Sequence, residues 1–433
     1  MKLWDKGVNI DAIMEDFTVG SDRAMDLRLA RWDVVASIAH TNMLVTVGLL
    51  GEADGKALVA ALSDLLVNID AGEFTIPDDA EDVHSHVERL LTEKLGDIGK
   101  RIHTGRSRND QVLVDLKLFL RHELRQIRSL VLDAAECLLT MAQKHRSVGL
   151  PGYTHHQVAM PSSFGLWFGG YAEALLEDVS VLDMAIYAAN ANPLGSAAGY
   201  GSTFPLDREE TTRALNFHRL HVTSTFAQMS RGRTEKLAAL ALGQVASTLA
   251  RYAHDVVLYC SQNLKFISLP DEFTTGSSIM PHKKNPDIFE VLRSRCNRLQ
   301  STHLEINSVL TNLASGYHRD VQFIKETIIR AIDELQTCLR VTLHGTPHIT
   351  PETNILQRDL YAYAYTVDRV DELVRSGIAF RDAYQTVASE VSTGTFVVPE
   401  TTTSTHIGSI GNPGLEILEG RLQELRVTQG EAS

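Results

Sequence analysis

Residues 110–145 decide the fold, and they read DQVLVDLKLFLRHELRQIRSLVLDAAECLLTMAQKH. This stretch contains neither proline nor glycine, and its apolar residues recur at steps of three and four. Such spacing places them on one face of an α-helix, and at 1.5 Å per residue that helix would be roughly 50 Å long. The apolar positions are Leu113, Leu116, Leu120, Leu124, Ile127, Val131, Ala134 and Leu138. The stretch therefore predicts one long helix with a buried face.

Two further stretches of comparable length predict long helices, one at about Glu235–Ser261 and one from Pro286 to about Asn312. Within the first, the run Leu237–Ala250 is apolar or small nearly all round, which suits a helix packed on several sides. The segment Leu58–Ile69 carries the spacing of an ordinary core helix. Long helices side by side form bundles, so we predict an all-α fold with an oligomeric bundle core.

Glycine, proline and polar residues gather at two places, Gly99–Arg108 and Gly345–Pro351, at the ends of long helical stretches. At 433 residues the chain exceeds one ordinary core. We therefore expect an N-terminal helical domain at 1–107, a central long-helix bundle domain at 108–348 and a C-terminal helical domain at 349–433.

The composition is that of a soluble globular protein, with 44% hydrophobic and 22% charged residues. No apolar run is long enough to span a bilayer, and the first residues resemble no signal peptide, so we expect a cytoplasmic protein. The net charge of -13 repels nucleic acid and anionic membranes, which argues against both as partners. Any bound anion must then be attracted by local basic groups.

Metal and disulfide chemistry are not indicated. The four cysteines lie far apart with no paired spacing, which predicts neither a zinc knuckle nor a disulfide framework. A group of acids and histidines, Asp82, His84, His86 and Glu88, lacks a ligand spacing known to close a metal shell. We predict no metal site.

The loop Gly276–Asp287, Gly-Ser-Ser-Ile-Met-Pro-His-Lys-Lys-Asn-Pro-Asp, predicts an anion site. Asn285 and Pro286 are typical of a cap and a first-turn proline, so a helix should begin at Pro286. Its free amide groups would face the loop that carries Lys283 and Lys284, which favours a bound carboxylate. A solvated basic turn or a phosphate loop would also be basic, but the Walker pattern is absent.

A second basic loop, Lys100–Asp110, ends where the long helix begins. Arg106, Ser107, Arg108 and Asn109 offer guanidinium groups, a hydroxyl and an amide near helix amides, which suits a carboxylate receptor. A surface loop whose arginines pair with nearby acids fits the spacing equally well.

A third motif, Pro151–Gln157, places Thr154 beside His155 and a second histidine. A lone histidine is usually structural, but one beside an anion-binding hydroxyl is able to act as a general acid or base near neutral pH.

Taken in order, several motifs resemble the fumarase and aspartase superfamily. They are Thr104–Val112, Pro151–His155, Pro193–Ser196 and Gly276–Asp287. The string His103–Gln111 is similar to argininosuccinate lyases specifically, and the likeness extends from about Leu3 to Glu326. The resemblance implies three mainly helical domains, no cofactor, and a homotetramer whose bundle takes five long helices per subunit and whose active sites are each shared by three subunits.

The implied reaction is β-elimination of argininosuccinate to arginine and fumarate, in arginine biosynthesis. By resemblance, Ser277 is the base, made basic by Lys283 and loop amides. His155, oriented by Glu290, is the candidate that protonates the departing nitrogen. Asn285 and Lys283 would stabilise the doubly charged carboxylate of the intermediate.

The remaining implied residues bind substrate. Ser107, Asn109 and Thr154 would hold its carboxylates. The positions that match those holding the arginine half are Tyr317, Gln322 and Lys325. For Lys325 alone, the alternative is a solvated helix face. The full set of substrate-binding residues is Ser107, Arg108, Asn109, Thr154, Asn285, Tyr317, Gln322, Lys325, Ser21 and His84.

The chain departs from the family pattern at several positions. Leu3–Val8 replaces a common Leu-Trp-Gly-Gly-Arg-Phe, and the position of the usual substrate serine is occupied by Gly20, next to Ser21. Gly232 stands where an arginine is expected, and His282 stands where a glutamine is commoner. These changes affect the amino-acid end of the substrate, and we hypothesise that its α-amino group is acylated. The sequence also leaves open adenylosuccinate as substrate, a catalytically silent homologue, and a hydrolase that uses Ser277 as nucleophile.

Overall fold

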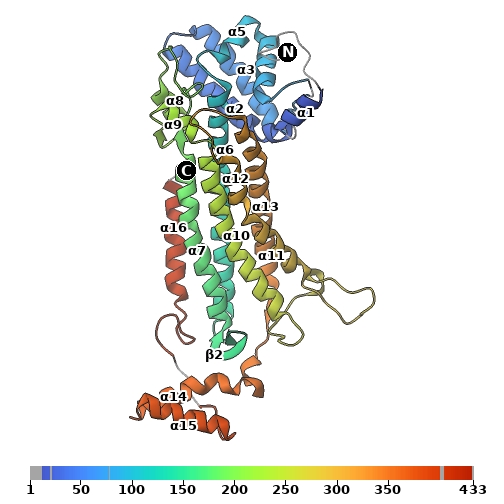
Figure 1. The fold of residues 1–433 in the computed structure, drawn as a ribbon, viewed down its shortest axis with the longest axis vertical. Coiled ribbons are helices and arrows are strands. Elements are labelled where there is room, and N and C mark those ends of the chain that lie inside the picture. The colour runs from blue at the N-terminus through green and yellow to red at the C-terminus, as the bar shows by residue number, and fades with distance from the viewer. Residues whose placement is uncertain (1–11, 20–21, 78, 400–403, 432–433) are drawn as a thin grey trace. The chain divides into compact units, whose positions relative to one another are not determined.

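The computed structural model describes residues 12–19, 22–77, 79–399 and 404–431. Helices dominate, which confirms the all-α prediction (Figure 1). In chain order the helices are α1 (Ala12–Val19), α2 (Asp22–Thr46), α3 (Glu52–Asp70), α4 (Val83–Leu95), α5 (Asp97–Lys100), α6 (Arg108–Lys144), α7 (Phe164–Ala189), α8 (Arg208–Ala214), α9 (Ser224–Met229), α10 (Arg233–Tyr259), α11 (Asp287–Leu299), α12 (Thr302–Leu310), α13 (Phe323–Gly345), α14 (Thr366–Arg375), α15 (Phe380–Ser392) and α16 (Leu415–Glu431).

Short strands form three two-stranded sheets in the described part of the chain. β1 (Gly149–Thr154) and β2 (Gln157–Ser163) form an antiparallel hairpin with an irregularity between Pro151 and Tyr153. The other pairs are β3 (Ala191–Asn192) with β4 (Arg219–Leu220), parallel, and β5 (Ile267–Ser268) with β6 (Thr350–Pro351), antiparallel.

The predicted long helices at 110–145 and 235–261 are confirmed as α6 and α10. All the apolar positions that defined the face of α6 are buried. In α10 the small residues are buried around most of the helix, while Leu240 is 46% exposed. The all-round apolar character of α10 therefore reflects packing on several sides, as predicted.

The single helix predicted from Pro286 to about Asn312 is wrong. The chain forms α11 and α12 instead, with a break at Gln300 and Ser301, where the Ser301 carbonyl accepts the first bonds of the new helix from Leu304 and Glu305. The Ser301-Thr302 pair has side chains that compete with the backbone for hydrogen bonds, which lowers helix propensity.

The chain divides into two compact units, and the expected three domains stay a prediction. The first unit comprises residues 1–128, 181–243 and 299–335, and the second comprises 129–180, 244–298 and 336–433. The unit boundaries fall inside α6, α7, α10, α11 and α13.

In the first unit, α2, α3 and α4 surround an apolar core that includes Leu44, Leu58, Leu62 and Val87. A buried cation links the longer helices of this unit, because the Lys117 ammonium in α6 donates to the Thr234 hydroxyl (2.9 Å) and to a carbonyl of α7.

In the second unit, polar contacts join the bundle helices. Gln244 and Thr248 of α10 both donate to the Asp178 carboxylate of α7, at 3.0 and 2.6 Å. The last helix, α16, lies along α6, where Arg426 pairs with Asp133 and with a neighbouring glutamate. Among the described residues, no helix is long and apolar enough to span a bilayer.

We predict that Leu62→Ala lowers the free energy of unfolding by about 2–5 kcal/mol, because it leaves a cavity in the core of the first unit. Val67→Ala is the control on the same helix, since Val67 is 68% exposed, and it should change stability by less than about 0.5 kcal/mol. Urea unfolding measures both; equal effects would contradict this description of the core.

Candidate active site

A cavity of 460 Å³ in the first unit brings distant parts of the sequence together. Six of the predicted substrate-binding residues line it: His84, Arg108, Asn109, Tyr317, Gln322 and Lys325. Their neighbours in the lining are carboxylates, further cations and one histidine whose pKa burial lowers, namely Asp22, Asp26, Glu81, Asp82, Arg231, Arg319 and His103. The lining therefore offers both signs of charge within one space.

The start of α6 is fixed by a carboxylate two residues beyond Arg108. The Ser107 N–H donates to Oδ1 of Asp110 (2.9 Å), while the Ser107 hydroxyl accepts from the Asn109 N–H (3.3 Å). The other oxygen of Asp110 accepts from the N–H groups of Gly195 and Ala197, both at 2.9 Å. Asp110 thus ties the second basic loop to the Pro193–Ser196 motif.

Arg108 is engaged with acids rather than free for a carboxylate ligand. Its guanidinium lies 2.8 Å from Asp82 and 3.3 Å from Glu81, and donates to the Ser85 hydroxyl at 2.9 Å. Asp82 also caps α4 by accepting from the Ser85 N–H. For Arg108, the structure shows an arginine that pairs with nearby acids, which was one of the two arrangements that fit the spacing.

Lys325 is buried, so its interpretation as part of a solvated helix face is wrong. Its ammonium pairs with Asp26 and, at 2.5 Å, with Asp22, whose other oxygen accepts from the Gln322 amide (2.7 Å). Burial alone would lower the pKa of Lys325, but the charges of Asp26 and Asp22 outweigh it and raise the pKa. Lys325 is therefore a permanent cation that orders two carboxylates at the cavity wall.

Tyr317 lies against a buried arginine that the sequence motifs did not single out. The Arg231 guanidinium stands 5.5 Å from the centre of the Tyr317 ring. The neighbouring Gly232 has a φ of 80°, and a Cβ there would come within 2.3 Å of the Leu310 side chain. The chain therefore leaves no room for an arginine at Gly232 in this conformation, although it supplies Arg231 to the cavity.

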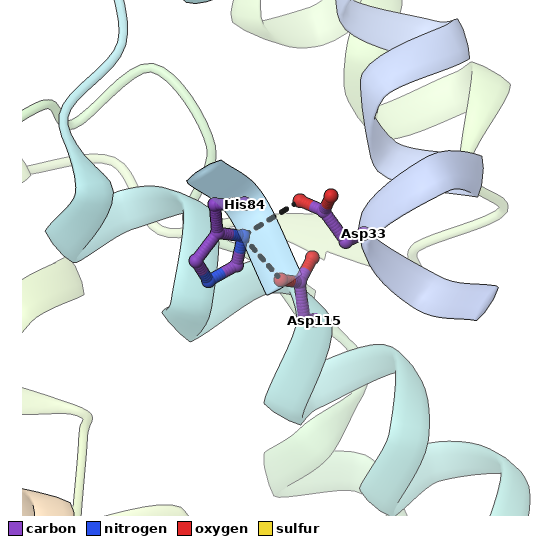
Figure 2. Close-up of side chains that lie close together, drawn as sticks. All are labelled: Asp33, His84 and Asp115. Carbon is purple, nitrogen blue, oxygen red and sulfur yellow. Dashed lines mark hydrogen bonds and ion pairs between the residues drawn. The ribbon is translucent and has the colours of Figure 1, made fainter. Parts of the chain in front are cut away.

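His84 lies between two carboxylates, as Figure 2 shows. Its Nδ1 is 2.9 Å from Oδ1 of Asp33 and 3.7 Å from Oδ2 of Asp115, and all three side chains are buried. Burial alone would lower the pKa of His84, but the carboxylates of Asp33, Asp82 and Asp115 raise it to about 9. The ring is therefore protonated at neutral pH, and the cluster is an ion pair whose Nδ1 is already occupied.

The acids and histidines considered for a metal do not form one group. Asp82 pairs with Arg108, whereas the His86 ring packs 5.3 Å from that of Phe74. The sequence motifs gave no indication of Asp33 and Asp115, which lie in α2 and α6 far from His84 in the chain. The one sequence signal for these two residues was that each is a charged residue at a buried position of an amphipathic helix.

In the second unit, Thr154 and His155 stand at the tip of the β1–β2 hairpin. His155 and His156 form its two-residue turn, with φ of 54° and 57°. Positive φ at both central positions is the geometry of a type I′ turn, which matches the twist of the strands but strains residues other than glycine, asparagine or aspartate. Both Thr154 and His155 are exposed, so the hairpin presents them to solvent in the single chain.

The loop Gly276–Asp287, also in the second unit, is closed at its base. Thr275 and Asn285 exchange two backbone hydrogen bonds, of 3.0 and 2.8 Å. The Ser277 hydroxyl accepts from the N–H groups of Ile279 (3.4 Å) and Met280 (3.2 Å). The helix begins at Asp287, one residue later than predicted.

The cations of this loop differ in their partners. Lys284 pairs with Asp271. Lys283 is exposed and makes no side-chain hydrogen bond or ion pair with the described residues, and Glu290, one turn into α11, is exposed as well. Lys283 is therefore the lysine available to an incoming anion.

The predicted residues thus fall into two groups by unit. Those described in the first unit line or adjoin one cavity, whereas those of the second unit lie separately on the β1–β2 hairpin and on the loop Gly276–Asp287. Within the described part of the chain, no hydrogen bond joins His155 to Glu290, so the orientation of His155 by Glu290 stays a prediction. Ser21 and Gly20 lie outside the described residues, as does the opening stretch Leu3–Val8.

Comparison with known proteins identifies the family. A family model described as Lyase matches residues 5–301. The chain is 49% identical over 411 residues to an argininosuccinate lyase of Parabacteroides distasonis, which covers 95% of this chain and 92% of that protein. The chain belongs to the argininosuccinate lyase family.

Solved structures of other proteins share the fold of this chain. An EDDS lyase in complex with formate is similar with a TM-score of 0.77 at 21% identity, covering 98% of this chain and 91% of that one. A class II fumarase from Schistosoma mansoni is similar with a TM-score of 0.71 at 16% identity, covering 90% and 95%. At these identities the likeness shows the fold alone, and it agrees with the resemblance seen in the sequence motifs.

Because the pKa of His84 is raised in the folded chain, we predict that the free energy of unfolding falls as the pH rises. Stability from a protonated His84 is fully present below its ordinary pKa of 6.5 and is lost as the pH rises through about 9. Between pH 6.5 and 8 the free energy of unfolding should fall by about 1.5 kcal/mol. Above pH 8, Lys117 acts with the opposite sign, because burial lowers its pKa to about 8.

Urea unfolding at pH 6.5 and pH 8 measures this fall. The matched variant His84→Asn cannot titrate and should not show it. A fall of the same size in the variant would assign the effect to another group.

Proposed function

We propose that this chain catalyses the β-elimination of argininosuccinate to arginine and fumarate, as a step of arginine biosynthesis. The observation that carries the proposal is that the cavity is lined by both acidic and basic side chains. Argininosuccinate bears a guanidinium, an ammonium and three carboxylates, and the lining supplies carboxylates at Asp22 and Glu81 beside cations at Arg231, Arg319 and His84. Charged groups of both signs recognise such a molecule by complementary pairing.

Ser277 is proposed to remove the proton next to the substrate carboxylate. A serine hydroxyl is a weak base unless its anion is stabilised. The amide N–H groups of Ile279 and Met280 already point at its oxygen, and Lys283 adds a positive charge from the same loop. These groups support an alkoxide at Ser277, while Lys283 and Asn285 stabilise the charge that develops on the carboxylate.

The departing nitrogen needs a proton, and His155 is proposed to supply it. Its place at a strained, exposed hairpin tip supports this role, since strain in a backbone concentrates at functional positions. Ser107, Asn109 and Thr154 are proposed to hold the substrate carboxylates, as motif positions that the family assigns to this task.

We further propose a cytoplasmic homotetramer with three-domain subunits, in which each active site combines the two groups of residues from different subunits. Exposed apolar side chains on helices support it, including Met184 of the long helix α7 (64% exposed) and Leu304 of the short helix α12 (59% exposed). Such residues are costly to leave in water and are typical of subunit interfaces.

Ser277→Ala should reduce turnover by at least about a thousandfold while argininosuccinate still binds, because the base is lost and the carboxylate contacts remain. Fumarate appearance, followed by its ultraviolet absorbance, measures turnover, and calorimetry measures binding. Ser278→Ala is the matched control and should keep activity within about tenfold. Substantial activity in Ser277→Ala would move the base elsewhere.

A second candidate substrate is argininosuccinate with an acylated α-amino group. A neighbouring cavity of 680 Å³, lined in part by Phe17 and Phe323, shares Asp22, Arg319 and Gln322 with the first. An acyl group attached to a substrate in the first cavity would find apolar surface and a cation there.

Offering argininosuccinate, its N-acylated form and adenylosuccinate separately distinguishes the candidates. We expect fumarate from argininosuccinate. A preference for the acylated compound of tenfold or more in kcat/KM, which is about 1.4 kcal/mol, would favour the second candidate, and no fumarate from any compound would indicate a silent homologue.

A further inference from the structure

Two fully buried carboxylates beside His84 have no part in the proposed chemistry. Asp33 comes from α2 and accepts from the Gln111 amide (2.7 Å) as well as pairing with His84. Neither oxygen of Asp115, from α6, has a hydrogen-bond partner among the described residues. Buried carboxylates are costly unless a cation compensates them, and the His84 ring lies between the two.

The opposite edge of the His84 ring is directed away from both carboxylates. Figure 2 shows Nδ1 toward Asp33 and Asp115, and the second ring nitrogen on the far side. His84 also lines the 460 Å³ cavity with Arg108 and Lys325. Because Nδ1 is occupied, Nε2 is the His84 nitrogen that is able to meet a molecule in the cavity.

The charges around His84 favour its protonated form from several elements. The groups that act on it are Asp26 and Asp33 of α2, Asp82 at the start of α4, Asp115 of α6, and His103 just before α6, whose charge alone would oppose protonation. Burial raises the pKa of Asp115 well above its usual value, although His84 and Arg106 lie near it. Burial alone would also raise the pKa of Asp33, but the charges of His84 and Arg106 outweigh it and lower that pKa. The carboxylates dominate, since the pKa of His84 is raised despite complete burial.

We propose that Asp33 and Asp115 are positioning residues for substrate binding: they hold His84 as an oriented cation whose Nε2 donates a hydrogen bond to a substrate carboxylate. The inference rests on the proposed function, which supplies the carboxylate. A hydrogen bond from a charged donor is roughly twice as strong as a neutral one. The two acids therefore act on affinity through His84 and touch no substrate atom.

The test is Asp33→Asn, which keeps the shape of the side chain and removes its charge. The pH dependence of kcat/KM reports the free enzyme. In the unmodified enzyme kcat/KM should fall as the pH rises through about 9. In Asp33→Asn this fall should move to lower pH by at least about one unit, with KM at pH 8 raised about tenfold and kcat changed less than about threefold.

His86→Asn is the matched control, because His86 lies on the same helix, is buried, and faces Phe74 rather than the cavity. Its profile should match that of the unmodified enzyme. A uniform loss of kcat/KM at every pH in Asp33→Asn, or an equal shift in His86→Asn, overturns the proposal. If Asp33→Asn does not fold, Asp115→Asn provides the same test, with a smaller shift in the same direction because Asp115 lies 3.7 Å away.

A separate measurement distinguishes failure of the proposed function from failure of this inference. If the unmodified enzyme releases no fumarate from argininosuccinate, that function fails, and calorimetric binding of argininosuccinate at pH 7 and pH 9.5 decides the role of the two acids. Weaker binding at pH 9.5 in the unmodified enzyme but not in His84→Asn supports the proposal. Affinity that does not change with pH, or absent binding, overturns it.

Discussion

A buried carboxylate is costly unless hydrogen-bond donors meet it, and Asp110 is met by three backbone amides. One comes from Ser107 at the start of α6, and two come from the loop at Gly195 and Ala197. The carboxylate therefore fixes where the longest helix begins and which loop lies beside it. Because Arg108 lies in the first turn of that helix, this arrangement also fixes its position in the cavity.

The same principle recurs around the cavity with side-chain cations in place of amides. Lys325 is balanced by Asp22 and Asp26, and His84 is balanced by Asp33 and Asp115. A buried ion pair stabilises the fold less than its attraction suggests, because the cost of removing charges from water offsets much of that attraction. Their contribution here is geometric, since each pair holds a charged group at one place in the cavity wall before any ligand arrives.

Periodicity was sufficient to predict α6 and α10, because an unbroken apolar face specifies a helix locally. No helix was predicted at α7, where close packing requires glycine: a Cβ at Gly165 would come within 2.8 Å of the backbone of Arg146. The motifs identified the residues of both groups by resemblance. Asp33 and Asp115 could be suspected only as charged residues at buried helix positions, and their place beside His84 follows from the folded arrangement alone.

The hairpin tip restricts how residue 155 is to be studied. With φ of 54° at His155 and 57° at His156, the turn favours residues that tolerate the left-handed region, which are glycine, asparagine and aspartate. An alanine scan at this tip would remove the imidazole and disturb the backbone in one step, so a lost activity would have two explanations. Asparagine retains the turn while lacking a titratable ring, and it separates the chemistry of the side chain from the conformation that presents it.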